Sequence, residues 1–95
     1  MVNCSIFDIR RQFDDIDKSI LILLATRTQL SKEMALQKKS NNMPVVQTEI
    51  WEQQLNNRKN ENDKLKVDSV FIDKIFSAIH DESIRIQNQE LDNLK

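Results

Sequence analysis

Apolar residues in the first third of the chain recur at alternating steps of three and four. The series is Ile6, Ile9, Phe13, Ile16, Ile20, Leu23, Leu30 and Met34. This spacing predicts one long amphipathic helix with a heptad-like seam. Ser5 followed by Asp8 predicts a capping box at its start, and the pattern first breaks at residues 40–44. We therefore expect a helix from about residue 5 to about residue 39, roughly 50 Å long.

The expected length of this helix has a consequence for assembly. A compact monomer of this size has a radius of gyration of only ~13 Å, so a helix of ~50 Å extends beyond it. The remaining residues are too few to cover the whole apolar seam. The simplest solution is a second copy of the chain, which predicts an intertwined homodimer.

Two shorter helices are expected after the turn at Pro44. The first runs from about residue 47 to about residue 62 and is mostly solvated, with Ile50, Trp51 and Leu55 as its apolar anchors. Leu65 and Val67 are interpreted as anchors of a linker.

The last helix is expected to begin after Asp68, a favourable N-cap, and to end at about residue 92. Its apolar stripe is Ile72, Ile75, Phe76, Ile79 and Ile86. The prediction is therefore an all-α fold with three helices per chain, forming one domain over residues 1–95 and a helical bundle in the dimer.

Composition supports this fold class. The 95 residues contain no glycine, which disfavours primed hairpin turns, glycine-rich phosphate loops and left-handed helix caps. A net charge of −1 gives no bulk positive field for non-specific nucleic-acid binding. With one cysteine (Cys4) and one histidine (His80), neither an intrachain disulfide nor a His/Cys metal cluster is expected.

Sequence features also bear on location. The longest apolar run, residues 20–25, is too short to cross a bilayer, and no signal-peptide pattern is seen. A cytoplasmic protein without membrane or nucleic-acid partners is the expectation.

Two cations interrupt the apolar seam of the first helix. Arg27 occupies the seam step after Leu23, and Lys38 follows eleven residues later. The two differ by only ~20° around the helix axis and ~16 Å along it, so they share one face. Alone, Arg27 is explained by snorkelling or an ion pair, and Lys38 by the helix dipole.

Other polar residues are candidates for the same site. Arg10 lies ~25 Å from Arg27 along the helix and could reach the Arg27 site only from a partner chain. Alternatively, Arg10 is a solvated cation balanced by nearby acids. Ser83 and Gln87 share one face of the last helix, where they form either part of a pocket or an ordinary polar pair. His80 is interpreted as a packed or surface histidine without a catalytic partner.

Together these residues indicate a pocket that suits a small polyanion, without a nucleophile or metal. At this point the chain resembles the all-helical, AroQ-type chorismate mutases from about Ile9 to Gln87. The resemblance rests on the order and spacing of Arg10, Ile16-Asp17, Ile20-Leu21-Ile22-Leu23-Leu24, Arg27, Leu30, Lys38, Pro44-Val45 and Ser83-Ile84-Arg85-Ile86-Gln87.

The resemblance implies an intertwined dimer with two equivalent sites that rearrange chorismate to prephenate, towards phenylalanine and tyrosine, without cofactor or metal. By position, Arg27 and the other chain's Arg10 would bind the two substrate carboxylates. Lys38 and Gln87 would hydrogen-bond the ether oxygen, and Ser83 would assist a carboxylate. Restricting the substrate to its reactive conformer and stabilising the developing charge would lower the barrier.

The chain departs from the family pattern at the start of the second helix. The family commonly has Asp, Arg and Glu where this chain has Gln47, Ile50 and Trp51. Gln47 and Trp51 resemble a Gln-x-x-Arg-Trp version found in some members. A one-residue slip would instead place Glu52 in the position of the family's Glu.

Two other functions remain open from the sequence. The same fold could act as an isochorismate pyruvate-lyase or a 4-amino-4-deoxychorismate mutase, since Gln47 removes an acid beside a ring substituent. Retention of Ser83 and Gln87 favours the mutase. A non-catalytic helical dimer, or a regulatory module paired with another shikimate-pathway enzyme, is disfavoured by the cations in the seam.

Overall fold

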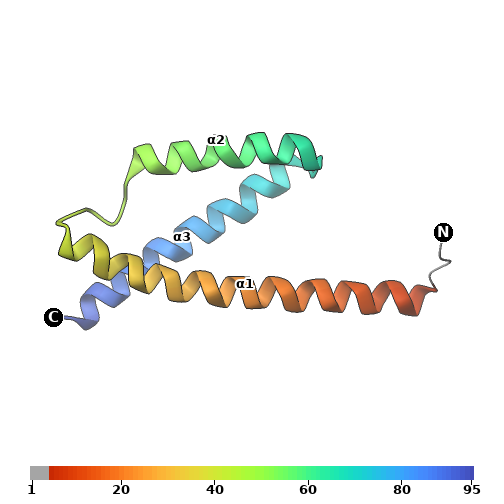
Figure 1. Ribbon diagram of the computed structural model, residues 1–95, viewed down its shortest axis with the longest axis horizontal. Coiled ribbons are helices and arrows are strands. Elements are labelled where there is room, and N and C mark those ends of the chain that lie inside the picture. The colour runs from red at the N-terminus through yellow and green to blue at the C-terminus, as the bar shows by residue number, and fades with distance from the viewer. Residues whose placement is uncertain (1–4) are drawn as a thin grey trace.

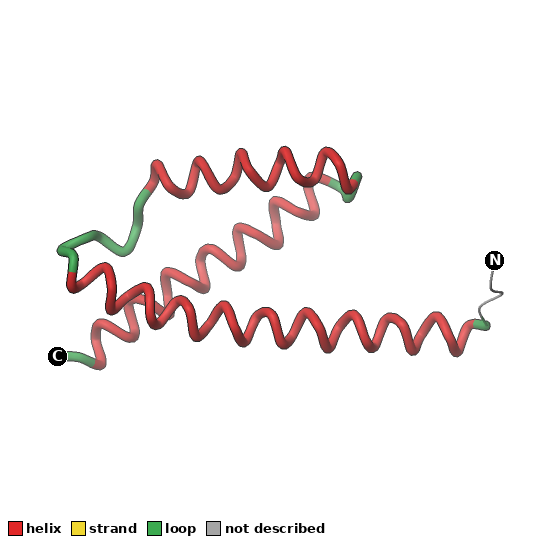
Figure 2. Tube along the Cα trace, viewed as in Figure 1, coloured by secondary structure: helices red, strands yellow, loops and turns green. Residues whose placement is uncertain are grey.

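The computed structural model describes residues 5–95 and consists of three helices joined by short connections. They are α1 (Ile6–Ser40), α2 (Thr48–Leu65) and α3 (Ser69–Asn93), arranged as shown in Figures 1 and 2. The part of the chain that the structure describes contains no strand, which confirms the all-α class. Cys4 lies outside the described residues.

The predicted capping box at the start of α1 is present. The backbone N–H of Asp8 donates to Ser5 Oγ at 3.2 Å, and the backbone N–H of Ser5 donates to Asp8 Oδ2 at 3.2 Å. These bonds satisfy backbone groups that a helix start otherwise leaves unpaired. α1 then continues for 35 residues, close to the predicted length.

The N-terminal half of α1 projects beyond the rest of the molecule. Figure 1 shows α3 crossing only the C-terminal half of α1, and the molecule measures 56 × 27 × 17 Å. Its radius of gyration is 17.3 Å, larger than the ~13 Å of a compact chain of this length. Residues of the predicted seam are therefore exposed, with Phe13 at 61% and Ile20 at 48%.

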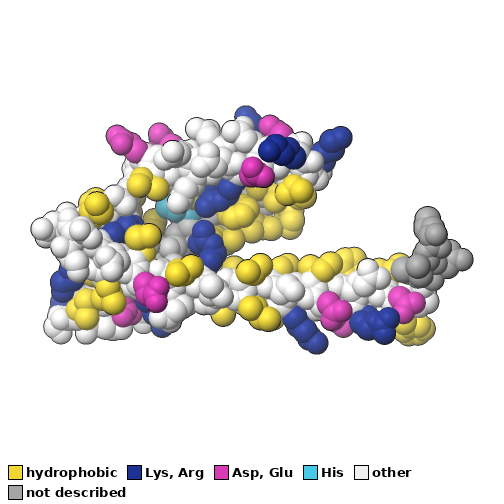
Figure 3. All heavy atoms as spheres, viewed as in Figure 1, with side chains coloured by type: hydrophobic (Ala, Val, Ile, Leu, Met, Phe, Trp, Pro, Cys, Tyr) yellow, Lys and Arg dark blue, Asp and Glu magenta, His cyan; other side chains and the backbone are white. Residues whose placement is uncertain are grey.

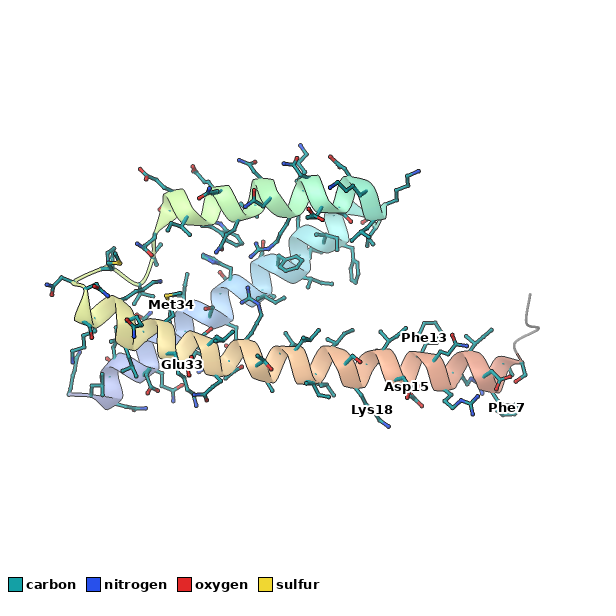
Figure 4. All side chains as sticks on the ribbon, viewed as in Figure 1. Phe7, Phe13, Asp15, Lys18, Glu33 and Met34 are labelled. Carbon is teal, nitrogen blue, oxygen red and sulfur yellow. The ribbon has the colours of Figure 1, made fainter. Side chains whose placement is uncertain are left out.

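The exposed seam lies on one side of α1. In Figure 4, Phe13 and Met34 project on the side of α1 that faces α2, whereas Asp15 and Lys18 project from the opposite side. Figure 3 shows hydrophobic side chains along that same edge of the helix. An apolar stripe of this length is left uncovered by α2 and α3.

The buried part of the chain is small and lies where α1 crosses α3. Ala35 of α1 and Ile86 of α3 are its buried apolar residues, and Ser31, Lys38 and Gln87 are buried beside them. α2 contains no buried residue, as its mostly solvated pattern predicted. Much of what is buried at this crossing is therefore polar, which marks it as more than a packing contact.

The connections differ from expectation in two respects. The second helix was expected to end at about residue 62 but continues to Leu65, so Leu65 is not in a linker and is 73% exposed. The expectation that a glycine-free chain avoids left-handed caps is also wrong. Lys66 closes α2 with φ 60°, and Asn62 holds this end through side-chain bonds of 2.8 and 3.2 Å to the backbone of Val67.

α3 begins as predicted, because the Asp68 carboxylate accepts the backbone N–H of Phe71 at 2.9 Å. The helix continues to Asn93, one residue beyond the expected end. α3 runs back toward the C-terminal part of α1. Ser83 and Gln87 of α3 therefore lie beside Ser31 and Lys38 of α1.

Candidate functional site

A cavity of about 330 Å³ lies between the three helices and the connection from α1 to α2. Figure 3 shows basic and histidine side chains gathered in the hollow between α2 and the other helices. The lining residues are Arg27, Leu30, Ser31, Met34, Lys38, Val45, Gln47, Ile50, Trp51, Gln54, Arg58, His80, Ser83, Ile84 and Gln87.

Lys38 connects three parts of the chain at the wall of this cavity. Its Nζ donates to the backbone oxygen of Val45 at 2.6 Å and to Oε1 of Gln87 at 2.9 Å. An ammonium group has three N–H donors, so these bonds leave a further donor available to a ligand. Burial lowers the pKa of Lys38 from its ordinary value of 10.5.

Gln87 and two serines extend this hydrogen-bond network. Nε2 of Gln87 donates to Ser83 Oγ at 3.1 Å, and the hydroxyls of Ser83 and Ser31 lie 2.8 Å apart. Gln87 is thereby oriented with its oxygen toward Lys38 and its amide nitrogen toward Ser83. The four side chains form a connected polar wall whose positions are fixed before any ligand binds.

An aromatic stack forms another wall. The rings of Trp51 and His80 lie parallel, with centroids 3.7 Å apart and an interplanar angle of 16°. Burial is the largest influence on His80 and lowers its pKa, Asp81 raises it, and the charges of Arg58 and Lys38 lower it further. The net shift is downward, so the imidazole is predominantly neutral above its ordinary pKa of 6.5.

Arg58 adds a cation to this wall. Its guanidinium carbon lies 4.4 Å from the centroid of the Phe76 ring and 5.3 Å from that of Trp51. Burial, and secondarily the charge of Arg27, lower the pKa of Arg58. Its Nη1 atom is buried and has no hydrogen-bond partner in the described chain.

The charges around the cavity have one sign. Arg27, Lys38 and Arg58 line it, and none of its described lining residues is Asp or Glu. Fixed cations without nearby acids create a positive potential that favours an anionic ligand. The cavity is thus suited to hold a small anion by side chains alone.

The structure brings together most of the candidate residues identified in the sequence. Arg27, Lys38, Gln47, Trp51, Ser83 and Gln87 all line the cavity. Arg10 lies far along α1 and Glu52 is exposed, and neither is a lining residue. Ile50 also lines the cavity, so the position where the family commonly has Arg is apolar here.

Sequence reasoning missed Arg58 and Ser31. Arg58 follows Trp51 by seven residues, about 20° short of two helical turns, so both side chains lie on one face of α2. Ser31 lies one turn after Arg27 and two turns before Lys38. The helical register of the recognised residues was the signal that could have revealed both.

Residues 5–95 contain neither a metal-binding cluster nor a membrane-spanning helix. No group of three or more His, Cys, Asp or Glu side chains is placed to hold a metal ion there. No helix within that range is long and apolar enough to cross a membrane.

Comparison with known proteins gives the family. The model of the chorismate mutase type II family matches residues 9–88. The chain belongs to the chorismate mutase type II family. The match extends from α1 to α3 and includes every residue that lines the cavity. Comparisons with curated proteins and with solved structures gave no match.

The match to the chorismate mutase type II family covers the segments that form the cavity. The match includes the α1 segment with Arg27 and Lys38 and the α3 segment with Ser83 and Gln87, which the fold places face to face. It also includes Gln47, Ile50 and Trp51 at the start of α2, each of which is a neutral or apolar residue.

Proposed function

We propose that this protein is a chorismate mutase that converts chorismate to prephenate. Within the substrate, one C–O bond breaks while one C–C bond forms, so no proton, electron or leaving group is exchanged with the protein. Such a reaction needs a binding site that selects the reactive conformer and stabilises charge. The cavity offers cations and neutral donors without requiring a nucleophile.

The observation that carries this proposal is the buried pair of Lys38 and Gln87. Lys38 Nζ and Gln87 Oε1 lie 2.9 Å apart, and both side chains are less than a tenth exposed. In the transition state the ether oxygen gains negative charge as the C–O bond breaks. The available N–H groups of Lys38 and Gln87 would donate to that oxygen, and donors fixed in advance need no reorganisation.

The substrate's carboxylates need cations as well. Arg27 lines the cavity and is proposed to bind one carboxylate, with Ser83 assisting through its hydroxyl. A bidentate pair between guanidinium and carboxylate fixes both orientation and charge. Such a pair would hold the flexible enolpyruvyl group in place.

We propose further that the working molecule is a homodimer, in which Arg10 of each chain enters the other chain's site. Support comes from α1, whose seam residues Ile9, Phe13 and Ile16 are between 44 and 61% exposed on a helix that overhangs its own bundle. A second copy packed along this seam would bury them. It would also bring Arg10, which lies outside its own chain's cavity, towards a second site.

A second candidate activity keeps the fold and changes the substrate. Gln47 lines the cavity where the family commonly has an acid, and none of the described lining residues supplies a replacement carboxylate. A carboxylate there would suit a ring hydroxyl, whereas an amide suits a wider range of substituents. The isochorismate pyruvate-lyase and the 4-amino-4-deoxychorismate mutase are therefore alternatives.

One assay separates these functions. The purified protein is incubated in parallel with chorismate, isochorismate and 4-amino-4-deoxychorismate, without added metal, and the products are separated and identified. We expect prephenate from chorismate at the highest kcat/KM. Release of pyruvate from isochorismate as the faster reaction would replace the proposal with the lyase. A folded dimer that leaves all three compounds unchanged would exclude all three activities and favour a regulatory role.

A further inference from the structure

Arg58, a residue of the cavity wall, has an unsatisfied donor that the candidate roles above do not use. Nη1 is buried and unpartnered in the described chain, although a guanidinium normally finds acceptors when it is withdrawn from water. A buried donor left without an acceptor costs free energy, more so when it is charged. Something absent from the isolated chain is needed to complete this group.

Ring packing explains only part of the position of Arg58. Its guanidinium carbon lies over Phe76 at 4.4 Å and near Trp51 at 5.3 Å, distances at which a cation is attracted to the ring faces. Cation–π contact uses the face of the guanidinium plane, however, and its N–H groups point outward within that plane. The rings therefore hold Arg58 in orientation without supplying a hydrogen-bond acceptor to Nη1.

The electrostatic surroundings of Arg58 indicate an anionic partner. The described structure gives it no ion pair with an acidic residue, and the charge of Arg27 acts on it unfavourably. Two arginines that repel one another across an acid-free cavity are both stabilised when an anion binds between them. A ligand with two carboxylates can neutralise both at once.

The residue at position 50 of α2 suggests why Arg58 would be needed to bind the substrate. Ile50 leaves an apolar side chain where the family commonly has Arg at the start of the second helix. Arg58 lies two turns further along α2 and returns a guanidinium to the same cavity. We propose that Arg58 is a substrate-binding residue, which donates from Nη1 to the carboxylate of a dicarboxylate ligand that Arg27 does not hold, alongside Arg10 of the second chain. This inference rests on the proposed function only in taking a dicarboxylate as the ligand.

The test compares dianion and monoanion binding in the full-length protein. Trp51 is the only tryptophan and stacks in the cavity wall, so its fluorescence reports on the site. The probes are cyclohexane-1,3-dicarboxylate and cyclohexanecarboxylate at constant ionic strength. Arg58→Met keeps an apolar stem over the rings and removes the donors. Lys59→Met removes a neighbouring exposed cation and serves as the matched control.

We expect Arg58→Met to weaken dicarboxylate binding by roughly tenfold or more, the effect of losing one charge-assisted hydrogen bond. Monocarboxylate affinity should change by no more than about twofold, because Arg27 still binds a single carboxylate. Lys59→Met should leave both affinities unchanged. An equal loss for both probes in Arg58→Met would show that Arg58 only packs, and would overturn the inference.

Two further outcomes separate this inference from the mutase proposal. If the wild type binds the dicarboxylate through Arg58 but leaves chorismate unchanged, the mutase proposal fails and the inference stands. If chorismate turns over with an unchanged KM in Arg58→Met, the inference fails and the mutase proposal stands.

An Arg58→Met variant that loses dimerisation but keeps its preference for the dicarboxylate would assign Nη1 to an acceptor on the second copy, and would also overturn the inference.

Discussion

Lys38 Nζ donates to Gln87 Oε1 at 2.9 Å, joining the last turn of α1 to the last third of α3. The pair is buried at the helix crossing, where apolar packing would otherwise be expected. Burying a charge is costly unless hydrogen bonds satisfy it. The bonds from Lys38 Nζ to Gln87 and to the Val45 carbonyl meet that requirement, and they fix the ammonium group at the cavity wall.

Replacing Lys38 with methionine should remove catalysis while keeping the fold. Methionine fits an apolar crossing and has no donor, so kcat for chorismate should fall by about 100-fold or more, as when one donor to a developing oxyanion is lost. Circular dichroism should show unchanged helix content. Lys39→Met alters the adjacent, exposed lysine and should retain full activity. A Lys38→Met variant with more than about a tenth of wild-type kcat would remove Lys38 from the proposed mechanism.

Mixing two inactive variants should restore activity if each site draws on both chains. Arg10→Ala and Arg27→Ala should each lower kcat/KM by about 100-fold or more, because a carboxylate loses its bidentate partner. Refolding them together in equal amounts forms hybrids in half of the dimers. Each hybrid has one intact site and one site lacking both arginines, so the mixture should show about a quarter of wild-type activity.

The controls for this experiment are the two variants refolded separately and then mixed without exchange, which should stay inactive. A refolded mixture that also stays inactive would place Arg10 in its own chain's site or outside any site. A monomeric mass by sedimentation, at concentrations where chorismate is converted, would contradict the dimer directly.

His80 should make stability depend on pH below its ordinary pKa of 6.5. Its folded-state pKa is lowered, chiefly by burial, so between that value and 6.5 the unfolded chain binds more protons than the folded one. Stability from this group is therefore complete above 6.5 and is lost as the pH falls through the lowered pKa. Urea unfolding should show the wild-type protein weakening as the pH falls below about 6.5.

The matched variant is His80→Phe, which keeps a flat ring beside Trp51 and cannot titrate. Its free energy of unfolding should change less over the same pH interval than that of the wild type. Equal slopes for the two proteins would show that other groups, and not the stacked imidazole, cause the pH dependence. Trp51 fluorescence should also be less sensitive to pH in His80→Phe, since protonation of the stacked ring is removed.

Lys66 offers a stability prediction that is independent of function. Its φ of 60° is left-handed, and a side chain with Cβ is strained there by about 1 kcal/mol relative to glycine. Lys66→Gly should therefore raise the free energy of urea unfolding by up to about this amount. Lys64→Gly, inside α2, should instead lower stability by roughly 1 kcal/mol. A destabilising Lys66→Gly would mean that the lysine side chain has a favourable contact there.

The sequence predicted the helices well because their determinants are local. Alternating steps of three and four define the apolar face of α1, and Ser5 and Asp8 meet within one turn, so helix and cap follow from short-range geometry. Arg27 and Lys38 share a face for the same reason. These relations hold on any straight helix, whatever it packs against.

Helical register places Arg58 on the same face of α2 as Trp51, but its contacts depend on how α2 packs against α3. In sequence it belongs to the second helix, which the pattern predicts to be mostly solvated. Only the packing of α2 against α3 brings Phe76 under its guanidinium, and only the whole fold places Arg27 nearby. The left-handed Lys66 was missed for a different reason: glycine is the residue that usually signals such a cap, and this chain uses Asn62 to hold the backbone instead.

The exposed N-terminal half of α1 makes stability a bimolecular quantity in the proposed dimer. Little apolar surface is buried within one chain, where Ala35 and Ile86 are the buried apolar residues of the described part. Most of the hydrophobic stabilisation would then come from association, and the unfolding midpoint should rise with protein concentration. Dilution would then cause the loss of the folded state and of the catalytic site together. The concentration of the protein in the cell would therefore determine what fraction of it is active.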